Sequence, residues 1–186
     1  MARLFLVRHG EPLDDWGGGA DPGLSRFGRN QVDHSAQRLV EFGPLKIVSS
    51  PAKRAQESAD PAAKLQRQKV ILEPRIGEVQ PPAGVSDARA WMLENFSSSS
   101  TKTWGDVDQR MRTYRDNVLA AVRGIEADTA MFTHYVAINI IVGAALRVDD
   151  IAVCRPDFAS ITELKVEKGD LRMVFYTDPL GEGRRG

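Results

Sequence analysis

Leu4-Phe5-Leu6-Val7-Arg8-His9-Gly10-Glu11 joins a short apolar run to a histidine that lies between an arginine and a glycine. Four apolar residues with this punctuation are typical of a buried parallel strand, which would deliver His9 to the C-terminal edge of a sheet. Open α/β sheets bind ligands in the crevice outside the carboxyl ends of their strands. A guanidinium binds two phosphate oxygens at once, and a neighbouring imidazole can attack phosphorus. The stretch therefore indicates a phosphoryl site, although a tetrapeptide alone is equally typical of a histidine in a surface turn.

Composition narrows the class of protein. The 186 residues carry 25 Lys and Arg against 25 Asp and Glu, a net charge of zero, which argues against nucleic-acid or anionic-membrane partners. No apolar run of about 18 residues predicts a membrane span, and the N-terminus lacks the pattern of a signal peptide. The single cysteine, Cys154, fits a reducing cytoplasm and is expected to be a small packed or partly exposed residue rather than a nucleophile. No histidine-rich or Cys-X-X-Cys spacing indicates a metal.

Strands and helices are predicted to alternate along the chain. Apolar runs predict strands at residues 4–7, 45–48, 70–72 and 130–133. Helical spacing and end signals predict helices at 25–42, 52–66, 104–122 and 136–146. The runs 161–166 and 171–176 flank a glycine-containing turn and predict a hairpin. This order predicts an α/β fold: a three-layer α/β/α sandwich whose central sheet is mostly parallel, with an antiparallel edge hairpin.

Three further residues are expected at the same sheet edge as His9. Arg54 follows the 45–48 strand, His134 ends the 130–133 strand, and Glu78 follows the 70–72 strand. The turn before Arg54 leads into a helix, whose first N–H groups favour an anion. Taken singly, each residue is as typical of an exposed arginine, a packed histidine or a solvated carboxylate. Their common position is what indicates a site.

Together these features resemble the histidine phosphatase superfamily, also called the phosphoglycerate mutase-like family. The segments that carry the resemblance appear in family order over residues 4 to about 146: Leu6-Val7-Arg8-His9-Gly10-Glu11, Leu24-Ser25-X-X-Gly28-X-X-Gln31, Ser49-Ser50-Pro51-X-X-Arg54-Ala55, Ile76-X-Glu78 and Thr133-His134. The first and third are quite specific, and the joint pattern is far rarer than any single motif. The resemblance implies one histidine phosphatase domain over residues 1–186.

The resemblance also implies a mechanism. His9 would be the nucleophile that forms a phosphohistidine intermediate, while Arg8, Arg54 and His134 would hold the phosphoryl oxygens. Glu78 would protonate the leaving alkoxide and then deprotonate the attacking water, a task for which burial would have to raise its pKa. Neither a metal nor a cofactor is expected. The expected substrate is a small phosphorylated metabolite.

Two departures from the family pattern concern the wall of the site. Tyr135 follows His134 where the family commonly has glycine, so a backbone contact to phosphate is in question and the side chain would narrow the pocket. After Glu78, the family's Gly-X-Trp-Glu-Gly segment is replaced by Gln80-Pro81-Pro82-Ala83-Gly84. Residues 80–103 are therefore predicted to be a divergent cap, with closure as a lid left open. Residues 181–186 are predicted to be a frayed tail.

The aromatic and methionine side chains of this segment favour core packing over lining a leaving-group pocket. They are Trp91, Met92, Phe96 and Trp104.

Several functions stay open at this point. Hydrolysis of a phosphomonoester is preferred to a mutase, because the longer insertions of mutases are not evident in so short a chain. A phosphohistidine-protein phosphatase is the nearest rival, and Glu78 counts against it. A non-catalytic phosphoester-binding module is the alternative of another class. The hairpin edge and the apolar helix at 136–146 offer candidate faces for a homodimer.

Overall fold

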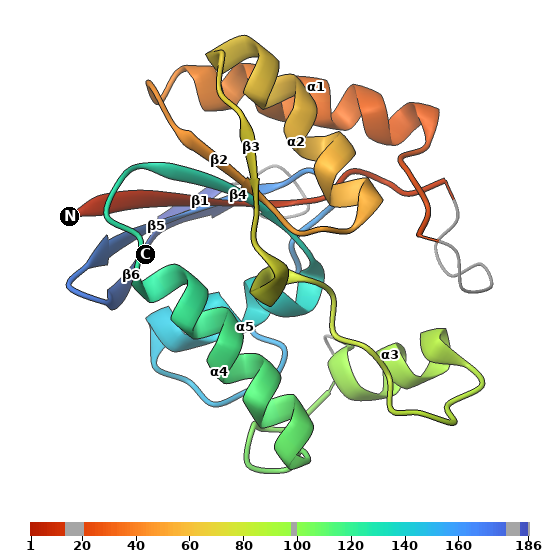
Figure 1. Cartoon of the computed structure of the whole chain (residues 1–186). Coiled ribbons are helices and arrows are strands. Elements are labelled where there is room, and N and C mark those ends of the chain that lie inside the picture. The colour runs from red at the N-terminus through yellow and green to blue at the C-terminus, as the bar shows by residue number, and fades with distance from the viewer. Residues whose placement is uncertain (14–20, 98–99, 178–182, 186) are drawn as a thin grey trace.

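The computed structural model describes residues 1–13, 21–97, 100–177 and 183–185 (Figure 1). The strands are β1 (Ala2–Arg8), β2 (Lys46–Ser49), β3 (Val70–Leu72), β4 (Thr129–Thr133), β5 (Ile161–Glu167), β6 (Asp170–Thr177) and β7 (Gly183–Arg185). The helices are α1 (Arg26–Val40), α2 (Lys53–Gln66), the short 3₁₀ helix η1 (Pro74–Ile76), α3 (Ala88–Phe96), α4 (Gln109–Arg123) and α5 (Tyr135–Leu146). No helix among these residues is long and apolar enough to cross a membrane.

One sheet organises the molecule, with strand order β3-β2-β4-β1-β5-β6-β7. The first four strands in this order pair in parallel, while β5, β6 and β7 add antiparallel strands on the other side of β1. Helices α1 and α2 cover one face, and α4 and α5 cover the other (Figure 1). The predicted α/β/α sandwich with a mostly parallel centre and an antiparallel edge is confirmed, and parallel pairing brings four strand ends to one edge.

Alternation along β1 divides the core between the two faces, since successive side chains point to opposite sides of a sheet. Phe5 and Val7 belong to the buried cluster that includes residues of α1 and α2. Leu4 and Leu6 belong to the cluster that includes residues of α4 and α5. All four side chains have no exposed surface. A strand buried on both faces explains why the sequence shows a continuous apolar run there.

The predicted helix over 104–122 is wrong at its start. Helix α4 begins at Gln109, because the carboxylate of Asp108 caps it by accepting a hydrogen bond from the Met111 N–H at 2.9 Å. Trp104 is buried before the helix, where its N–H donates to the carbonyl of Asp149. The apolar spacing thus continues into an irregular segment that serves the same core.

Parts of two further predicted segments are ordered elements. The predicted cap contains α3, whose N-cap Asp87 accepts from the Ala90 N–H at 2.8 Å. In the predicted frayed tail, residues 183–185 form β7 and pair with β6, which corrects the prediction there. Residues 181, 182 and 186 of the tail, and the triplet Gly17-Gly18-Gly19, lie outside the described residues.

A close backbone contact fastens the turn after β1 to the start of α1. A Cβ on Gly28 would lie 2.1 Å from the carbonyl oxygen of Glu11, and a Cβ on Gly10 would lie 2.6 Å from the carbonyl oxygen of Gly28. Ser25 completes the joint: its hydroxyl accepts from the Gly28 N–H at 2.9 Å and donates to Glu11 Oε1 at 2.6 Å. The Gln31 amide oxygen accepts the Glu11 N–H at 2.9 Å.

This joint predicts that Gly28→Ala destabilises the fold, because the added methyl meets backbone that cannot move aside. We expect a loss of about 3 kcal/mol in the free energy of unfolding, measured by urea denaturation. Gly124→Ala is the matched control, since a Cβ there meets nothing within 4 Å. Equal unfolding midpoints for the two variants would contradict the proposed contact.

Candidate active site

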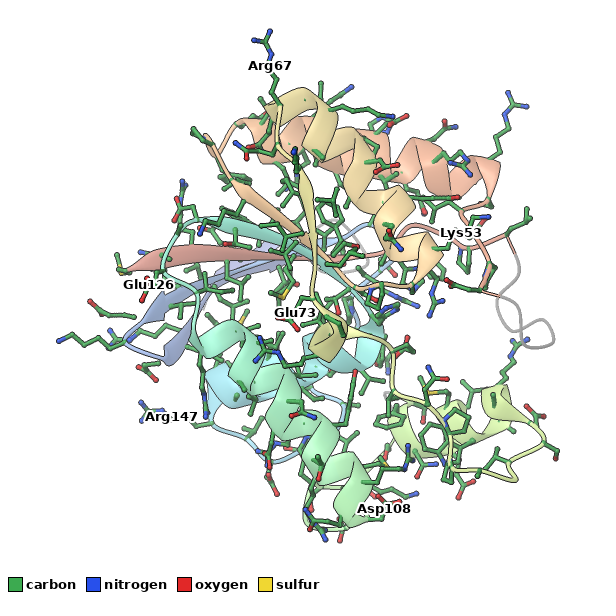
Figure 2. All side chains as sticks on the ribbon, in the orientation of Figure 1. Lys53, Arg67, Glu73, Asp108, Glu126 and Arg147 are labelled. Atoms are coloured by element: carbon green, nitrogen blue, oxygen red, sulfur yellow. The ribbon has the colours of Figure 1, made fainter. Side chains whose placement is uncertain are left out.

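Four strand ends supply the candidate site. His9 follows β1, Ser50 follows β2 and His134 follows β4, while β3 leads through η1 to Glu78. In Figure 2 this edge of the sheet can be found from two labels. Lys53 is the first residue of α2, and Glu73 is the residue that follows β3. Parallel pairing is therefore what brings residues far apart in the sequence to one place.

The ring of His9 is held in one tautomer. Its Nδ1 lies 2.8 Å from the Gly10 carbonyl, which can only accept, so Nδ1 carries the proton. Its Nε2 then has a lone pair, which accepts a hydrogen bond from Arg54 Nε at 3.3 Å. Burial lowers the pKa of His9 well below its ordinary value, and the charges of Arg54 and Arg8 lower it further. The result is a neutral imidazole with an unprotonated nitrogen.

His134 is fully buried beside His9, with ring centroids 5.2 Å apart. Its Nε2 lies 2.8 Å from the Ser50 hydroxyl, and its Nδ1 lies 3.3 Å from Arg54 Nη2. Burial is the main cause that lowers the pKa of His134 well below its ordinary value, followed by electrostatic coupling to the His9 ring and by the charges of Arg54 and Arg8. This second imidazole is therefore neutral as well.

Glu78 points one carboxylate oxygen at this cluster. Its Oε2 lies 3.4 Å from His134 Nδ1 and 3.9 Å from Arg54 Nη2, while its Oε1 is buried without a hydrogen-bond partner among the described residues. Burial raises the pKa of Glu78, against the lowering effect of Arg54 and Arg8. A carboxyl with a raised pKa and one unsatisfied oxygen is suited to exchanging a proton with a ligand.

Two hydrogen bonds hold the backbone that carries Glu78. The Tyr114 hydroxyl of α4 donates to the Gly77 carbonyl at 2.8 Å. The Thr133 hydroxyl, at the end of β4, donates to the Ile76 carbonyl at 2.7 Å. Thr133 thereby ties the loop of Glu78 to the strand that delivers His134, so the two side chains keep their spacing.

Arg8 reaches the site along the loop that precedes β5. Its Nη1 donates to the Pro156 carbonyl at 3.0 Å, and its guanidinium lies 4.1 Å from the ring centroid of Phe158 and 5.4 Å from that of Tyr135. Cation–π contacts of this kind hold a guanidinium plane without using up its donors. Arg8 is thus oriented by two aromatic rings.

Two helices begin at the site. Helix α5 starts at Tyr135 directly after His134, and α2 starts after Ala52, which provides no side-chain cap. The carboxylate of Asp21 serves α2 instead, accepting the Lys53 N–H at 2.7 Å, and its other oxygen lies 3.5 Å from Arg54 Nη1. Helix N-termini favour negative charge, so both add to the positive potential here.

Most of these side chains line a cavity of about 940 Å³, whereas His134 is fully buried beside Arg54 and is not one of the lining residues. The charged lining residues of the cavity are Arg8, Asp21, Arg54, Glu78 and Arg89. The prediction that His9, Arg8, Arg54, Glu78 and His134 meet at one edge agrees with this geometry, whereas their chemical roles stay predictions.

Sequence reasoning did not single out Ser50, Tyr114, Asp21 or Phe158 as members of the site. Ser50 was visible in the Ser49-Ser50-Pro51 motif, but its bond to His134 depends on neighbouring strands. Phe158 lies in an irregular loop with no periodic signal. Cys154 is half-buried, and burial raises the pKa of its thiol to about 12, which fits the expected inert residue.

The geometry of His9, Glu78 and His134 would also admit a cation, because one ligand atom from each lies within 4.8 Å of the others. The guanidinium of Arg54 lies against all three side chains, at 3.3 Å from each ring and 3.9 Å from the carboxylate. Its positive charge opposes a metal ion and favours an anion at the same place.

Two histidines, two arginines and two helix N-termini at one edge of the sheet form a site in this α/β protein whose positive charge favours an anion. The family model of the histidine phosphatase superfamily (branch 1) matches residues 4–179. The chain therefore belongs to the histidine phosphatase superfamily, which includes phosphatases and phosphoglycerate mutase-like proteins.

Individual relatives agree with this family. A bifunctional protein of Mycobacterium tuberculosis is 28% identical over 162 residues, which cover 77% of this chain and 44% of that protein, so the chain spans less than half of it. A probable phosphoglycerate mutase of Erwinia tasmaniensis is 25% identical over 168 residues, 78% of this chain and 75% of that protein. The structure of a mycobacterial glucosyl-3-phosphoglycerate phosphatase superposes with a TM-score of 0.67 at 22% identity, covering 93% of this chain and 97% of that one.

The lowered pKa of His134 makes a prediction about stability. The folded protein keeps this ring neutral while the unfolded chain protonates it below about pH 6.5, so the unfolded state binds more protons there. The free energy of unfolding must then fall as pH drops from about 6.5 towards 5. Each such histidine contributes a slope of up to about 1.4 kcal/mol per pH unit, and His134→Gln removes one such contribution. Urea denaturation at a series of pH values measures the slope.

His34→Gln is the control, because this histidine is exposed on α1. The raised pKa of Glu78 acts in the opposite sense, because it stabilises the fold as pH falls through the folded-state pKa of this carboxyl. Glu78 is present in the wild type, in His134→Gln and in His34→Gln, so its contribution is common to the comparison. Identical slopes for the wild type and His134→Gln would show that the ring does not stay neutral in the folded state.

Proposed function

We propose that this protein is a metal-independent phosphatase that hydrolyses a phosphomonoester through a phosphohistidine on His9. One observation carries the proposal: the unprotonated Nε2 of His9 is presented beside the guanidinium of Arg54 in a cavity that Arg8 and Glu78 also line, while the buried ring of His134 lies against Arg54. Phosphoryl transfer needs a nucleophile, a proton donor and groups that hold the phosphoryl oxygens. Here His9 would be the nucleophile, Glu78 the proton donor, and Arg8, Arg54 and His134 the phosphoryl cradle.

Charge supports the proposal. Arg8 and Arg54 carry two positive charges, both histidines are neutral, and Glu78 is the carboxylate with the raised pKa. When Glu78 is protonated, these residues together carry a net charge of about +2, which the two negative charges of a phosphate dianion neutralise. Binding of the dianion would in turn favour the protonated carboxyl that the first step requires.

The reaction proceeds in two displacements. His9 Nε2 attacks phosphorus while the bond to the ester oxygen breaks, and Glu78 gives its proton to the leaving alkoxide. Glu78, now a carboxylate, takes a proton from water as that water attacks the phosphohistidine, which releases inorganic phosphate and restores both residues. Arg8, Arg54 and His134 hold the three equatorial oxygens throughout.

Hydrolysis is favoured over mutase chemistry within this proposal. A phosphoglycerate-type mutase must hold the carboxylate of its substrate as well as the phosphoryl group. Apart from Arg8 and Arg54, the described lining of the cavity offers one cation, Arg89, which is exposed in the first turn of α3. The raised pKa of Glu78 also favours an oxygen ester over a phosphohistidine substrate, whose leaving nitrogen needs less help from an acid.

The first test is phosphate release from p-nitrophenyl phosphate with excess EDTA present. We expect activity that the chelator does not reduce and that His9→Ala lowers at least about 10³-fold, because the covalent path is lost. Acid-sensitive, base-stable labelling of the wild type and not of the variant would identify the phosphohistidine. His34→Ala is the control. Phosphate binding without turnover by the wild type would instead favour the non-catalytic module.

The role of Glu78 predicts a dependence on the leaving group. Glu78→Gln should slow hydrolysis of an alkyl phosphate about 10²- to 10⁴-fold in kcat/KM, because the alkoxide then departs unprotonated. The loss should be much smaller for p-nitrophenyl phosphate, whose leaving group needs little protonation. Glu73→Gln is the matched control, because that carboxylate pairs with Arg75 outside the cavity lining. Equal losses on the two esters would exclude Glu78 as the general acid.

A further inference from the structure

We propose that the cavity beside the phosphoryl cradle selects phosphomonoesters of bulky, mainly apolar alcohols. The inference rests on the proposed phosphatase function and adds the class of leaving group. At about 940 Å³ the cavity is near the upper end of the range of about 300–1,000 Å³ typical of pockets for drug-sized ligands. A phosphoryl group occupies only the end formed by Arg8, His9 and Arg54, so the remaining volume is available to the leaving group.

Helix α3 provides the first apolar wall. Met92 and Phe96 are buried and line the cavity, and Leu93 lines it while 57% of its surface is exposed. Phe96 is steadied by Trp91, whose ring lies edge-on to it at 5.5 Å. A leucine left exposed at a cavity wall gains by being covered, and a ligand in the cavity would cover it.

The residues between Glu78 and α3 extend this wall. Val79 is buried directly after the carboxylate, and Pro81 follows it on the cavity lining. The segment that departs from the family pattern thus supplies apolar surface next to the predicted proton donor. The ester oxygen would lie at Glu78, and the carbon skeleton attached to that oxygen would meet Val79 and Pro81 first.

Two aromatic rings provide further apolar surface. Phe158 and Tyr135 both line the cavity, and both contact the guanidinium of Arg8. Their rings therefore adjoin the phosphoryl cradle and the space beyond it. Tyr135 stands where the family commonly has glycine, so this ring adds contact surface that a glycine would lack.

The charges on the lining argue against a leaving group with its own anionic group. Among the described lining residues outside the cradle, Arg89 is the only cation, and Asp21 is a half-exposed carboxylate held near Arg54 at 3.5 Å. A second phosphate or a carboxylate on the substrate would be repelled by Asp21 and would find one solvent-screened partner. An apolar carbon skeleton is not repelled by Asp21 and needs no cationic partner.

The test compares esters of equal intrinsic reactivity. 3-Phenylpropyl phosphate and propyl phosphate leave as similar primary alkoxides, so a difference in kcat/KM reports contacts with the leaving group. We expect the phenylpropyl ester to be favoured at least about 10-fold, since each extra apolar group in a fitting pocket adds about 10-fold or more. O-Phosphoserine, of similar size to the propyl ester but charged, should be the poorest of the three.

Leu93→Ser should lower the ratio of kcat/KM for the phenylpropyl ester to that for the propyl ester about 5- to 10-fold. Leu65→Ser on α2 is the matched control, because that leucine is 54% exposed and is absent from the cavity lining. Both side chains are exposed, so neither variant should lose its fold, which circular dichroism checks.

The outcomes separate this inference from the proposed function. Measurable turnover with similar kcat/KM for the two alkyl esters, or with phosphoserine preferred, would overturn the inference and leave the phosphatase function standing. Equal losses on both esters in Leu93→Ser would also overturn it. Absence of turnover of every ester by the wild type would overturn the proposed function, and the inference with it.

Discussion

The guanidinium of Arg54, which lies against two buried imidazoles, and the nearby charge of Arg8 constrain everything at the edge of this sheet. An arginine stays charged at any pH at which the protein folds, so the histidines beside it are the groups that must give up a proton. Burial lowers the pKa of both rings in the same direction. The same desolvation raises the pKa of Glu78. One physical cause therefore favours a neutral imidazole and a carboxyl that binds a proton more readily, side by side, whereas solvent favours the ionised carboxylate near neutral pH.

That arrangement needs a rigid support, because like charges and unsatisfied oxygens would separate if the loops could move. Three short connections provide it. Ser25 and the Gly10–Gly28 contact hold the turn of His9 against α1, Ser58 accepts the Gly10 N–H at 3.0 Å, and Thr133 ties the Glu78 loop to β4. The motif residues around the first helix thus act on the site through the backbone next to His9 rather than by contacting the cavity.

The features that could be predicted are those that leave a pattern in neighbouring residues of the sequence. Strands buried on both faces produce apolar runs, and residues at their ends share one edge, which is how His9, Arg54 and His134 could be placed together. Helix α3 could not be predicted from the sequence, because it is nine residues long and buries only Met92 and Phe96. Two buried residues are too few to show the 3.6-residue spacing of a helix. Helix α4 was extended back to Trp104 because core packing continues through an irregular segment. Bonds such as that between Ser50 and His134 join residues 84 positions apart and leave no local trace.

Tyr135 shows why the class of function is easier to derive than the substrate. It is the first residue of α5 and directly follows the N-cap His134, so its N–H is one of the unpaired donors at a helix start whatever side chain it carries. Replacing the family's common glycine therefore alters the space beside Arg8 more than it alters the anion site itself. The same division holds across the cavity. The cradle depends on backbone and strand order, which many sequences of one fold share, whereas the apolar walls depend on side chains from α3 and the loop of Phe158. Substrate choice can then diverge while the phosphoryl chemistry stays in place.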